Sequence, residues 1–339
     1  MFNKLYEKIK NYIKENKIPI IIFALLYILF TYPLPYYVYT KGNTINISDK
    51  VIIAGEYKQK GSFSFSYVNE LKGTVPVILL SYIIPNWELI KVEEKKATVT
   101  ESIEDIDFRN RMFLIDSIQN ATIVVYNKLG KKVNILDKNH YIVYIDKIAN
   151  TDLEVKDEIV AVNDKTIESG EEYTNIVNSL NFNDTLEIKV IDSNNITKNK
   201  KIKILNYKGN KITGIYIISK LKYETDPNIK YNFSRQESGP SGGLMLALTI
   251  YNKLTEIDIT KGKKIVGTGT IERNGNIGSV SGINHKLKGA VTNKADIFLV
   301  PNGDNYNEAI KLKDENNYNI TIIGVSTFDD ALNYLELMS

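Results

Sequence analysis

The chain has no cysteine and only two histidines, His140 and His285, among its 339 residues. Without cysteine, no disulfide, no thiolate nucleophile and no thiolate metal ligand can form. Two histidines leave few ways to build a zinc cage or a Ser-His-Asp triad, so we predict no metal and no cofactor. The chain also lacks Gly-x-x-x-x-Gly-Lys-Ser/Thr, the loop that cradles nucleotide phosphates, so ATP is not an expected partner.

The net positive charge is confined to the N-terminus. The formal net charge of +3 resides in residues 1–17, which hold five lysines against two glutamates, and the remainder of the chain is neutral. Nucleic acid requires a basic face, so no nucleic-acid partner is expected. The hydrophobic content of 43% is typical of a globular protein, and the length allows two or three domains.

Residues 18–39 contain no charged side chain. A helix needs roughly 20 apolar residues to cross a bilayer, so this run predicts one N-terminal transmembrane helix in contact with membrane lipid. The lysines of residues 1–17 would then form a cytoplasmic lead, with the rest of the chain outside the cell. The alternative is a cleaved signal peptide, which shares the charged start and the apolar run, although no small-x-small cleavage site follows.

The hydrophobic periodicity changes along the chain. Strands are predicted at 51–54, 62–68 and 75–80, and a helix at 101–129 that ends at Gly130. Strands return over 131–207, interrupted by a short helix at 171–180. The C-terminal part alternates between helices at 242–253, 284–292, 304–313 and 327–337 and strands at 264–268, 297–300 and 320–325. We therefore predict an α+β fold.

The segment Ser-Gly-Pro-Ser-Gly-Gly-Leu at 238–244 predicts a tight turn that leads into an apolar helix. Ser241 would lie at or near the N-terminus of that helix, where free N–H groups and the helix dipole can stabilise an oxyanion. Gly239, Pro240 and Gly242 would shape the turn and leave room for a substrate backbone. The alternative is that Ser241 only caps the helix, because serine is a preferred N-cap.

A second segment, 281–290, supplies a lysine that could act as a base. A lysine can accept the proton of a serine hydroxyl only when neutral, and burial lowers its pKa toward that state. Lys286 and Lys288 are the two candidates. Their directions on a helix differ by about 200°, so only one of them can face inward. Either lysine could instead be an ordinary surface charge.

Three motifs in order resemble those of Lon-type proteases. Residues 239–243 resemble the Gly-Pro-Ser-Ala-Gly signature, 267–271 resemble the Thr-Gly-Glu-Ile strand, and 282–286 fall on the Gly-Leu-Lys-Glu-Lys segment with its catalytic lysine. The resemblance implies that Ser241 is the nucleophile and that Lys286, not Lys288, is its base. It also implies that Thr268 forms a hydrogen bond within the dyad.

The resemblance has departures and covers part of the chain. Ser238, Gly242 and Thr270 replace the usual Asp or Gly, Ala and Glu. Without an ATPase, the chain resembles the ATP-independent, membrane-anchored bacterial branch, which carries an inserted PDZ domain. That branch implies a discontinuous protease domain, with a first part at 40–130, the insert at 131–207 and the Ser-Lys part at 208–339.

Residues 155–165 of the insert resemble the Gly-Asp-x-Ile-x-x-Val-Asn-Gly run of PDZ domains, with Lys156 and Asp164 in place of glycines. PDZ domains add an extended peptide to a sheet edge beside a helix. The expected edge is 141–145, with Tyr141, Ile142 and Val143 as peptide-binding residues. The loop 138–140 would bind a carboxylate. The alternative is a packing domain without a working groove.

Together these observations predict an extracytoplasmic, membrane-anchored serine endopeptidase that cleaves short or flexible peptides and proteins. The rival is a non-catalytic PDZ scaffold or adaptor at the membrane. The sequence leaves the substrate, the cleavage site and the oligomeric state open.

Overall fold

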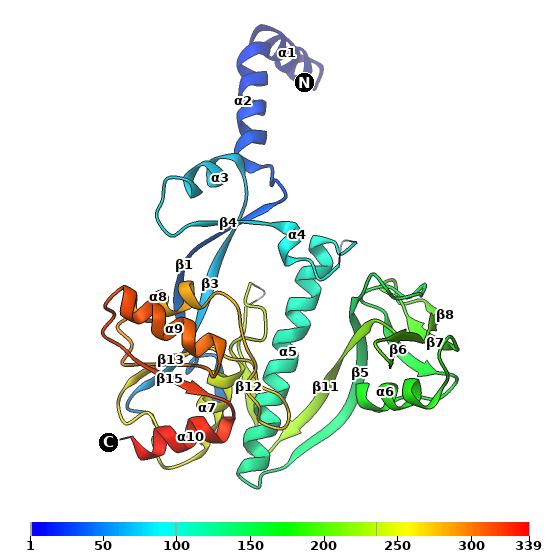
Figure 1. Cartoon of the computed structure of the whole chain (residues 1–339). Coiled ribbons are helices and arrows are strands. Elements are labelled where there is room, and N and C mark those ends of the chain that lie inside the picture. The colour runs from blue at the N-terminus through cyan, green and yellow to red at the C-terminus, as the bar shows by residue number, and fades with distance from the viewer. Residues whose placement is uncertain (1, 99, 235, 339) are drawn as a thin grey trace. The chain divides into compact units, whose positions relative to one another are not determined.

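The computed structural model describes residues 2–98, 100–234 and 236–338 (Figure 1). The chain forms two compact units, one from residues 1–41 and 69–95 and the other from 42–68 and 96–339. Strands β1 (Tyr36–Asn46) and β3 (Ser62–Lys72) contribute residues to both units.

The first unit is mostly helical. In it, β4 pairs antiparallel with the first residues of β1, from Tyr36 to Tyr39. Its other elements are α1 (Phe2–Glu15), α2 (Lys17–Thr31), α3 (Val75–Ser81), β4 (Glu88–Lys91) and α4 (Val92–Lys95).

The predicted transmembrane helix at 18–39 is wrong. Helix α2 has 15 residues and ends at Thr31, and the chain is already extended as β1 from Tyr36. At 1.5 Å per residue such a helix is about 22 Å long, short of the roughly 30 Å hydrocarbon core. Over residues 2–98, 100–234 and 236–338, none of the helices combines the length and apolarity that a membrane span needs. The predicted single-pass membrane localisation is therefore wrong as well, and no spanning helix supports the predicted contact with membrane lipid.

Residues 75–80 form a helix, α3, and not the predicted strand. The run is rich in strand-favouring residues, but Pro76 lies in the first turn, where a missing N–H costs nothing because that N–H has no partner inside the helix. Thr74 precedes the helix in an extended conformation. The local turn geometry thus outweighs the side-chain propensity.

The second unit is built on a largely parallel sheet. Strand order is β15-β14-β13-β3, followed by β1, and the first four strands run parallel. The predicted α+β class is therefore corrected to mixed α/β, because strands that alternate with helices return in the same direction. The C-terminal elements are α7 (Gly243–Leu254), β13 (Lys264–Gly267), α8 (Ile283–Thr292), β14 (Ile297–Pro301), α9 (Asp304–Glu315), β15 (Thr321–Val325) and α10 (Phe328–Leu337).

Side chains of the sheet alternate between two hydrophobic cores. Ile265 and Leu299 pack in the core formed with α7 and α10. Val266 and Phe298 point the other way, into the core formed with α8 and α9. Successive residues of a strand face opposite sides, so one sheet buries both helical layers. Two short pairs complete this unit: β2 (Val51–Ile53) with β12 (Ile229–Tyr231), and β9 (Leu205–Tyr207) with β10 (Asn210–Ile212).

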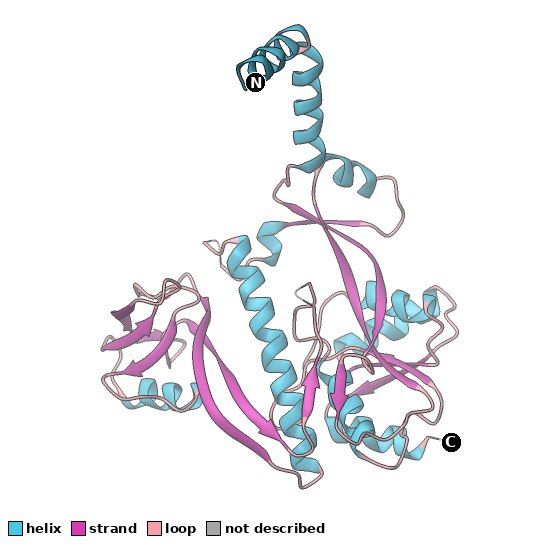
Figure 2. Cartoon of the chain, turned by 180° about the vertical axis from the view of Figure 1, so that it is seen from behind, coloured by secondary structure: helices cyan, strands magenta, loops and turns pink. Residues whose placement is uncertain are grey.

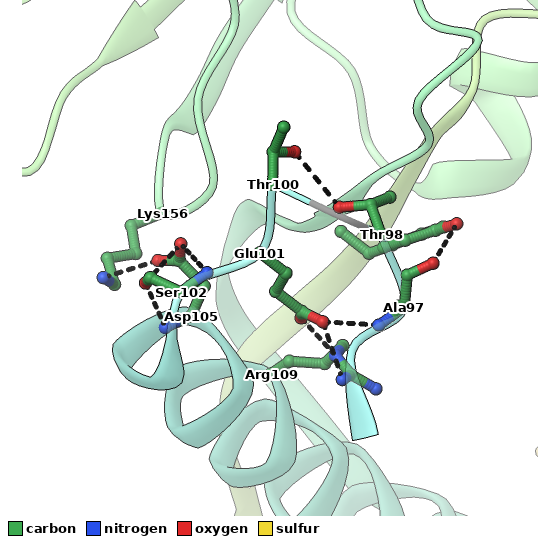
Figure 3. A network of polar contacts seen from close by, with 9 residues as sticks. Ala97, Thr98, Thr100, Glu101, Ser102, Asp105, Arg109 and Lys156 are labelled. Carbon is green, nitrogen blue, oxygen red and sulfur yellow. Dashed lines mark hydrogen bonds and ion pairs between the residues drawn. The ribbon is translucent and has the colours of Figure 1, made fainter. Parts of the chain in front are cut away.

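The predicted helix at 101–129 is present as α5 (Ile103–Lys128). Ser102 and Asp105 form a capping box at its start, and Gly130 follows its end with a left-handed φ of 66°. Near the start of the helix, Arg109 forms an ion pair with Glu101 (Figure 3). The ammonium group of Lys156 donates a hydrogen bond to the Asp105 carboxylate at 2.8 Å.

Residues 133–225, which include nearly all of the predicted insert at 131–207, form a five-stranded antiparallel sheet with strand order β11-β5-β6-β7-β8 (Figure 2). A helix, α6, packs on it and buries Tyr173 and Val177. The name insert is kept for residues 133–225. The sheet runs from Val133 to Thr225, past residue 207. The elements are β5 (Val133–Ile145), β6 (Glu158–Val162), α6 (Gly170–Ser179), β7 (Thr185–Ile191), β8 (Thr197–Lys203) and β11 (Ile215–Thr225).

Candidate active site

Ser241 lies in a turn just before α7, and the N-cap of that helix is Gly242, with no side-chain cap bond. The alternative that Ser241 only caps the helix is therefore wrong. Among the described residues its hydroxyl has no hydrogen-bond partner, and the residue is half-buried. The hydroxyl is thus left available for other chemistry.

Helix α5 holds the turn on its N-terminal side. The N–H of Gly239 donates to the carbonyl oxygen of Asn110 at 2.9 Å, and the hydroxyl of Ser117 donates to the carbonyl oxygen of Pro240 at 3.2 Å. Gly239 has φ of 90°, a value that favours glycine. Neither Asn110 nor Ser117 was among the predicted site residues, because no sequence motif connects them to a turn more than 120 residues away.

Thr268, immediately after β13, holds the same turn from the sheet side. Its hydroxyl donates to the carbonyl oxygen of Ser241 at 3.1 Å, and the N–H of Gly269 donates to the same oxygen at 2.8 Å. Thr268 is fully buried. The structure thus brings Thr268 and Ser241 together, through the backbone of the serine rather than its side chain.

Two backbone N–H groups at the turn have no partner among the described residues, those of Ser241 and Gly242. Of the predicted turn residues, Pro240 has no N–H, and the N–H of Gly239 is bonded to Asn110. Pro240 and Gly239 therefore shape the turn, while the N–H groups of Ser241 and Gly242 are the ones that can receive an anionic oxygen.

Lys286 lies on α8, which begins after Gly282, a glycine with φ of 72°. The side chain is only 5% exposed, and burial alone lowers the pKa of Lys286 from 10.5 to about 8. In the part of the chain that the structure describes, no acidic group offsets that burial. Lys288, by contrast, is half-buried, in keeping with its different direction on the helix. No hydrogen bond joins the ammonium nitrogen of Lys286 to the Ser241 hydroxyl within the described residues.

The position of α8 depends on a close approach between two glycines. A Cβ on Gly289 would lie 2.9 Å from the carbonyl carbon of Gly42 and 3.0 Å from the nitrogen of Asn43. A Cβ on Gly42 would lie 2.3 Å from the carbonyl oxygen of His285. These glycines let α8 pack directly on the β1 backbone, which fixes the depth at which Lys286 is buried.

Residues 234–337 match the Lon protease (S16) C-terminal proteolytic domain. The match spans Ser241, Thr268 and Lys286, and it confirms the predicted Lon-type resemblance over this part of the chain. This similarity supports a serine protease domain over residues 234–337. A search of curated proteins found no match to the chain.

Three solved structures align with part of the chain, all at low similarity. The first is the PDZ domain of an SdrC-like protein from Listeria innocua, with 22% identity, coverage of 23% of this chain and 92% of that chain, and a TM-score of 0.22. The PDZ domain of the SdrC-like protein from Listeria monocytogenes has 18% identity, covers 24% and 90%, and has a TM-score of 0.22. The second domain of a listeria protein has 20% identity, covers 25% and 87%, and has a TM-score of 0.21.

The structure shows the surroundings of two departures from the Lon signature, Gly242 and Thr270. A Cβ on Gly242 would lie 3.5 Å from the Phe65 ring, which is an ordinary contact. The site therefore has room for the usual alanine, and lack of space does not explain the glycine. Thr270 accepts a hydrogen bond from the N–H of Gly278 at 3.1 Å and so closes the turn after β13. Nothing in the structure explains Ser238 in place of Asp or Gly.

The predicted peptide-binding edge in the insert is not a free edge. Strand β5 lies between β11 and β6, and β11 pairs with it along its whole length. Ile142 and Val143 are fully buried, and Tyr141 pairs with strands on both sides. Residues 138–140 belong to β5 and form no loop. The expectation fails because β11 arrives from beyond residue 207, outside the predicted insert.

The turns at Lys156 and Asp164 keep the glycine-type conformation. Their φ angles are 80° and 63°, so both residues adopt the left-handed region that glycine favours. Asn163, with φ of 47°, completes the turn after β6. The replacement of the usual glycines therefore preserves the turn geometry of this PDZ-like run.

Proposed function

We propose that the chain is an ATP-independent serine endopeptidase in which Ser241 is the nucleophile, Lys286 the general base and Thr268 a positioning residue. The substrate is a short or flexible peptide or protein segment, because the sequence carries no ATPase motif to unfold a larger one. The single observation that carries the proposal is Lys286, a buried lysine whose pKa is lowered to about 8 with no acid beside it.

In the proposed reaction Ser241 Oγ attacks the carbonyl carbon of the scissile peptide bond while its proton passes to Lys286 Nζ. The carbonyl π bond opens, and the N–H groups of Ser241 and Gly242 receive the oxyanion. The C–N bond then breaks, and Lys286 returns the proton to the departing amine. Water, deprotonated by Lys286, then adds to the acyl carbonyl carbon. The C–Oγ bond breaks, and Lys286 returns the proton to Ser241 Oγ as the new carboxyl product leaves.

The lysine is suited to this role by what surrounds it. A charged ammonium group is poorly solvated when buried, so the neutral form is populated near neutral pH. His285, the neighbouring residue, is also buried, but on a helix it points about 100° away from Lys286. Burial alone does not choose between the two residues, and we assign the base to Lys286 because burial lowers its pKa to about 8.

The deciding experiment compares the purified wild-type chain with Ser241→Ala on a fluorescently labelled, unfolded casein. We expect cleavage by wild type and none by the variant, and labelling of wild type alone by a fluorophosphonate. If neither protein cleaves casein although both are folded by circular dichroism, the non-catalytic scaffold is favoured. Equal cleavage by the two proteins would exclude Ser241 as the nucleophile.

We also propose that the insert binds the substrate chain beside the N-terminal half of β5. On the side of β5 away from β11, β6 pairs only with His140 and Tyr141. Next to the unpaired part lies a hollow of about 390 Å³. Its lining residues are Ile135, Leu136, Asp137, Lys138, Ile167 and Glu168. Ile135 and Leu136 are exposed hydrophobic residues, which suit an extended peptide added to a strand edge.

A further inference from the structure

We infer that Ser117, on α5, is a positioning residue that sets the direction of the Ser241 backbone N–H. The inference rests on the proposed function, because it assigns that N–H to the oxyanion of the reaction. It adds a residue from a distant helix to the site.

The argument begins with one peptide unit. The Ser117 hydroxyl and the Gly243 N–H both donate to the Pro240 carbonyl oxygen, each at 3.2 Å. That carbonyl and the N–H of Ser241 belong to the same planar trans peptide, in which C=O and N–H point in opposite directions. Holding the oxygen toward α5 therefore turns the Ser241 N–H away from α5.

The next peptide unit is fixed in the same way from the opposite side. Thr268 and Gly269 donate to the Ser241 carbonyl oxygen, and this directs the Gly242 N–H away from the end of β13. The two peptides that flank the nucleophile are thus held at their oxygens by different elements, α5 and the strand end. Both N–H groups are left without a partner among the described residues.

Ser117 is itself closely held. It is 3% exposed, and a Cβ on Gly243 would lie 2.6 Å from its hydroxyl oxygen. Gly243 therefore leaves just the space that the hydroxyl needs. Asn110 lies two helical turns before Ser117 on the same face of α5 and accepts the Gly239 N–H, so the helix contacts the turn at two points.

The test separates positioning from packing by using two ligands. A peptide aldehyde binds as a transition-state mimic: Ser241 Oγ adds to the aldehyde carbon, the carbonyl π bond opens to an oxyanion, and the hydroxyl proton passes to Lys286. The second ligand, termed the product, is the cleaved peptide without its terminal carboxylate, so it forms no such bond and brings no anionic oxygen to these N–H groups. Only the aldehyde complex needs the Ser241 N–H in its set direction.

For Ser117→Ala we expect kcat on the casein substrate to fall by roughly tenfold, the size expected for one lost hydrogen bond of this kind. KM should change less than twofold. The aldehyde should bind more weakly by the same factor as kcat/KM falls, while product affinity and the midpoint of the pH profile stay unchanged. Ser117→Cys, which keeps the volume but donates weakly, should behave similarly.

Thr122→Ala is the matched control, since Thr122 is buried on the same helix and its hydroxyl donates to the Ile118 carbonyl. We expect it to lower the melting temperature and leave kcat unchanged. If Ser117→Ala weakens aldehyde and product equally, or retains full kcat, the inference fails although wild type remains a Ser241-dependent peptidase. If wild type itself cleaves nothing, the proposed function fails first.

Discussion

The hydroxyl of Thr268 donates a hydrogen bond to the carbonyl oxygen of Ser241, with the two oxygens 3.1 Å apart. This bond ties the turn that carries the proposed nucleophile to the end of β13, in the middle of the parallel sheet. The turn gains a fixed geometry without any contact to the Ser241 hydroxyl, which stays free to react.

Thr268→Val removes that hydroxyl and keeps the shape of the side chain. We expect kcat to fall about tenfold and the free energy of unfolding to fall by about 1 kcal/mol, because one buried hydrogen bond is lost. Steady-state cleavage and urea denaturation measure the two effects. Thr249→Val is the control, since Thr249 is equally buried and donates within α7 to Met245. A Thr268→Val enzyme as fast as Thr249→Val would refute the positioning role.

The pH dependence should report Lys286. Because the base must be neutral and the pKa of Lys286 is about 8, kcat/KM should rise with pH through about 8 and level off above it. Lys286→Arg should be nearly inactive, since arginine stays protonated and cannot accept the proton. Lys288→Ala, two residues away and half-buried, should be mild.

The variant His285→Ala tests the rival base in the same activity assay. We expect His285→Ala to keep most of the activity per folded molecule. If that variant is folded and inactive while Lys286→Arg still cleaves, a Ser-His arrangement replaces the dyad.

The buried lysine should also cost stability. The unfolded state holds its proton up to about 10.5 and the folded state only to about 8, so below pH 8 the charged lysine destabilises the fold by about 3 kcal/mol. Between pH 8 and 10.5 the unfolded state binds more protons, and wild-type stability relative to a neutral variant rises. Lys286→Met should therefore be more stable than wild type at pH 7, and the difference should shrink by pH 10. Urea denaturation at both pH values measures it, and an unchanged difference would contradict the burial of the charge.

The hollow beside β5 should affect capture more than chemistry. Leu136→Asp places a charge on a side chain that is 48% exposed at this hollow, so we expect KM for casein to rise several-fold. Hydrolysis of a small activated ester should remain unchanged. Ile196→Asp, in the same insert and 54% exposed but outside the hollow, is the control. Equal loss of both activities in Leu136→Asp would show that the insert supports the fold of the protease instead.

Local pattern predicted the C-terminal part of the chain well. Helices α7 to α10 and strands β13 to β15 all lie within two or three residues of their predicted limits, because apolar spacing and caps are local properties. The motif positions of Ser241 and Lys286 were likewise visible in the sequence. The uncharged run at 18–39 predicts too long a helix, because its last residues, from Tyr36, belong to strand β1.

The sequence by itself determined the residues to which we assign the chemistry: a serine in a glycine-rich turn, a threonine after a strand and a lysine on a short helix. Only the tertiary structure decided what holds them. Ser117 reaches Pro240 across 123 positions, and β11 closes the edge of β5 from 70 or more residues away. Such contacts depend on how α5 packs against α7 and the insert, and no local propensity encodes that packing. The depth of Lys286, and so its lowered pKa, arises in the same way from Gly42 and Gly289, which let two distant backbones meet.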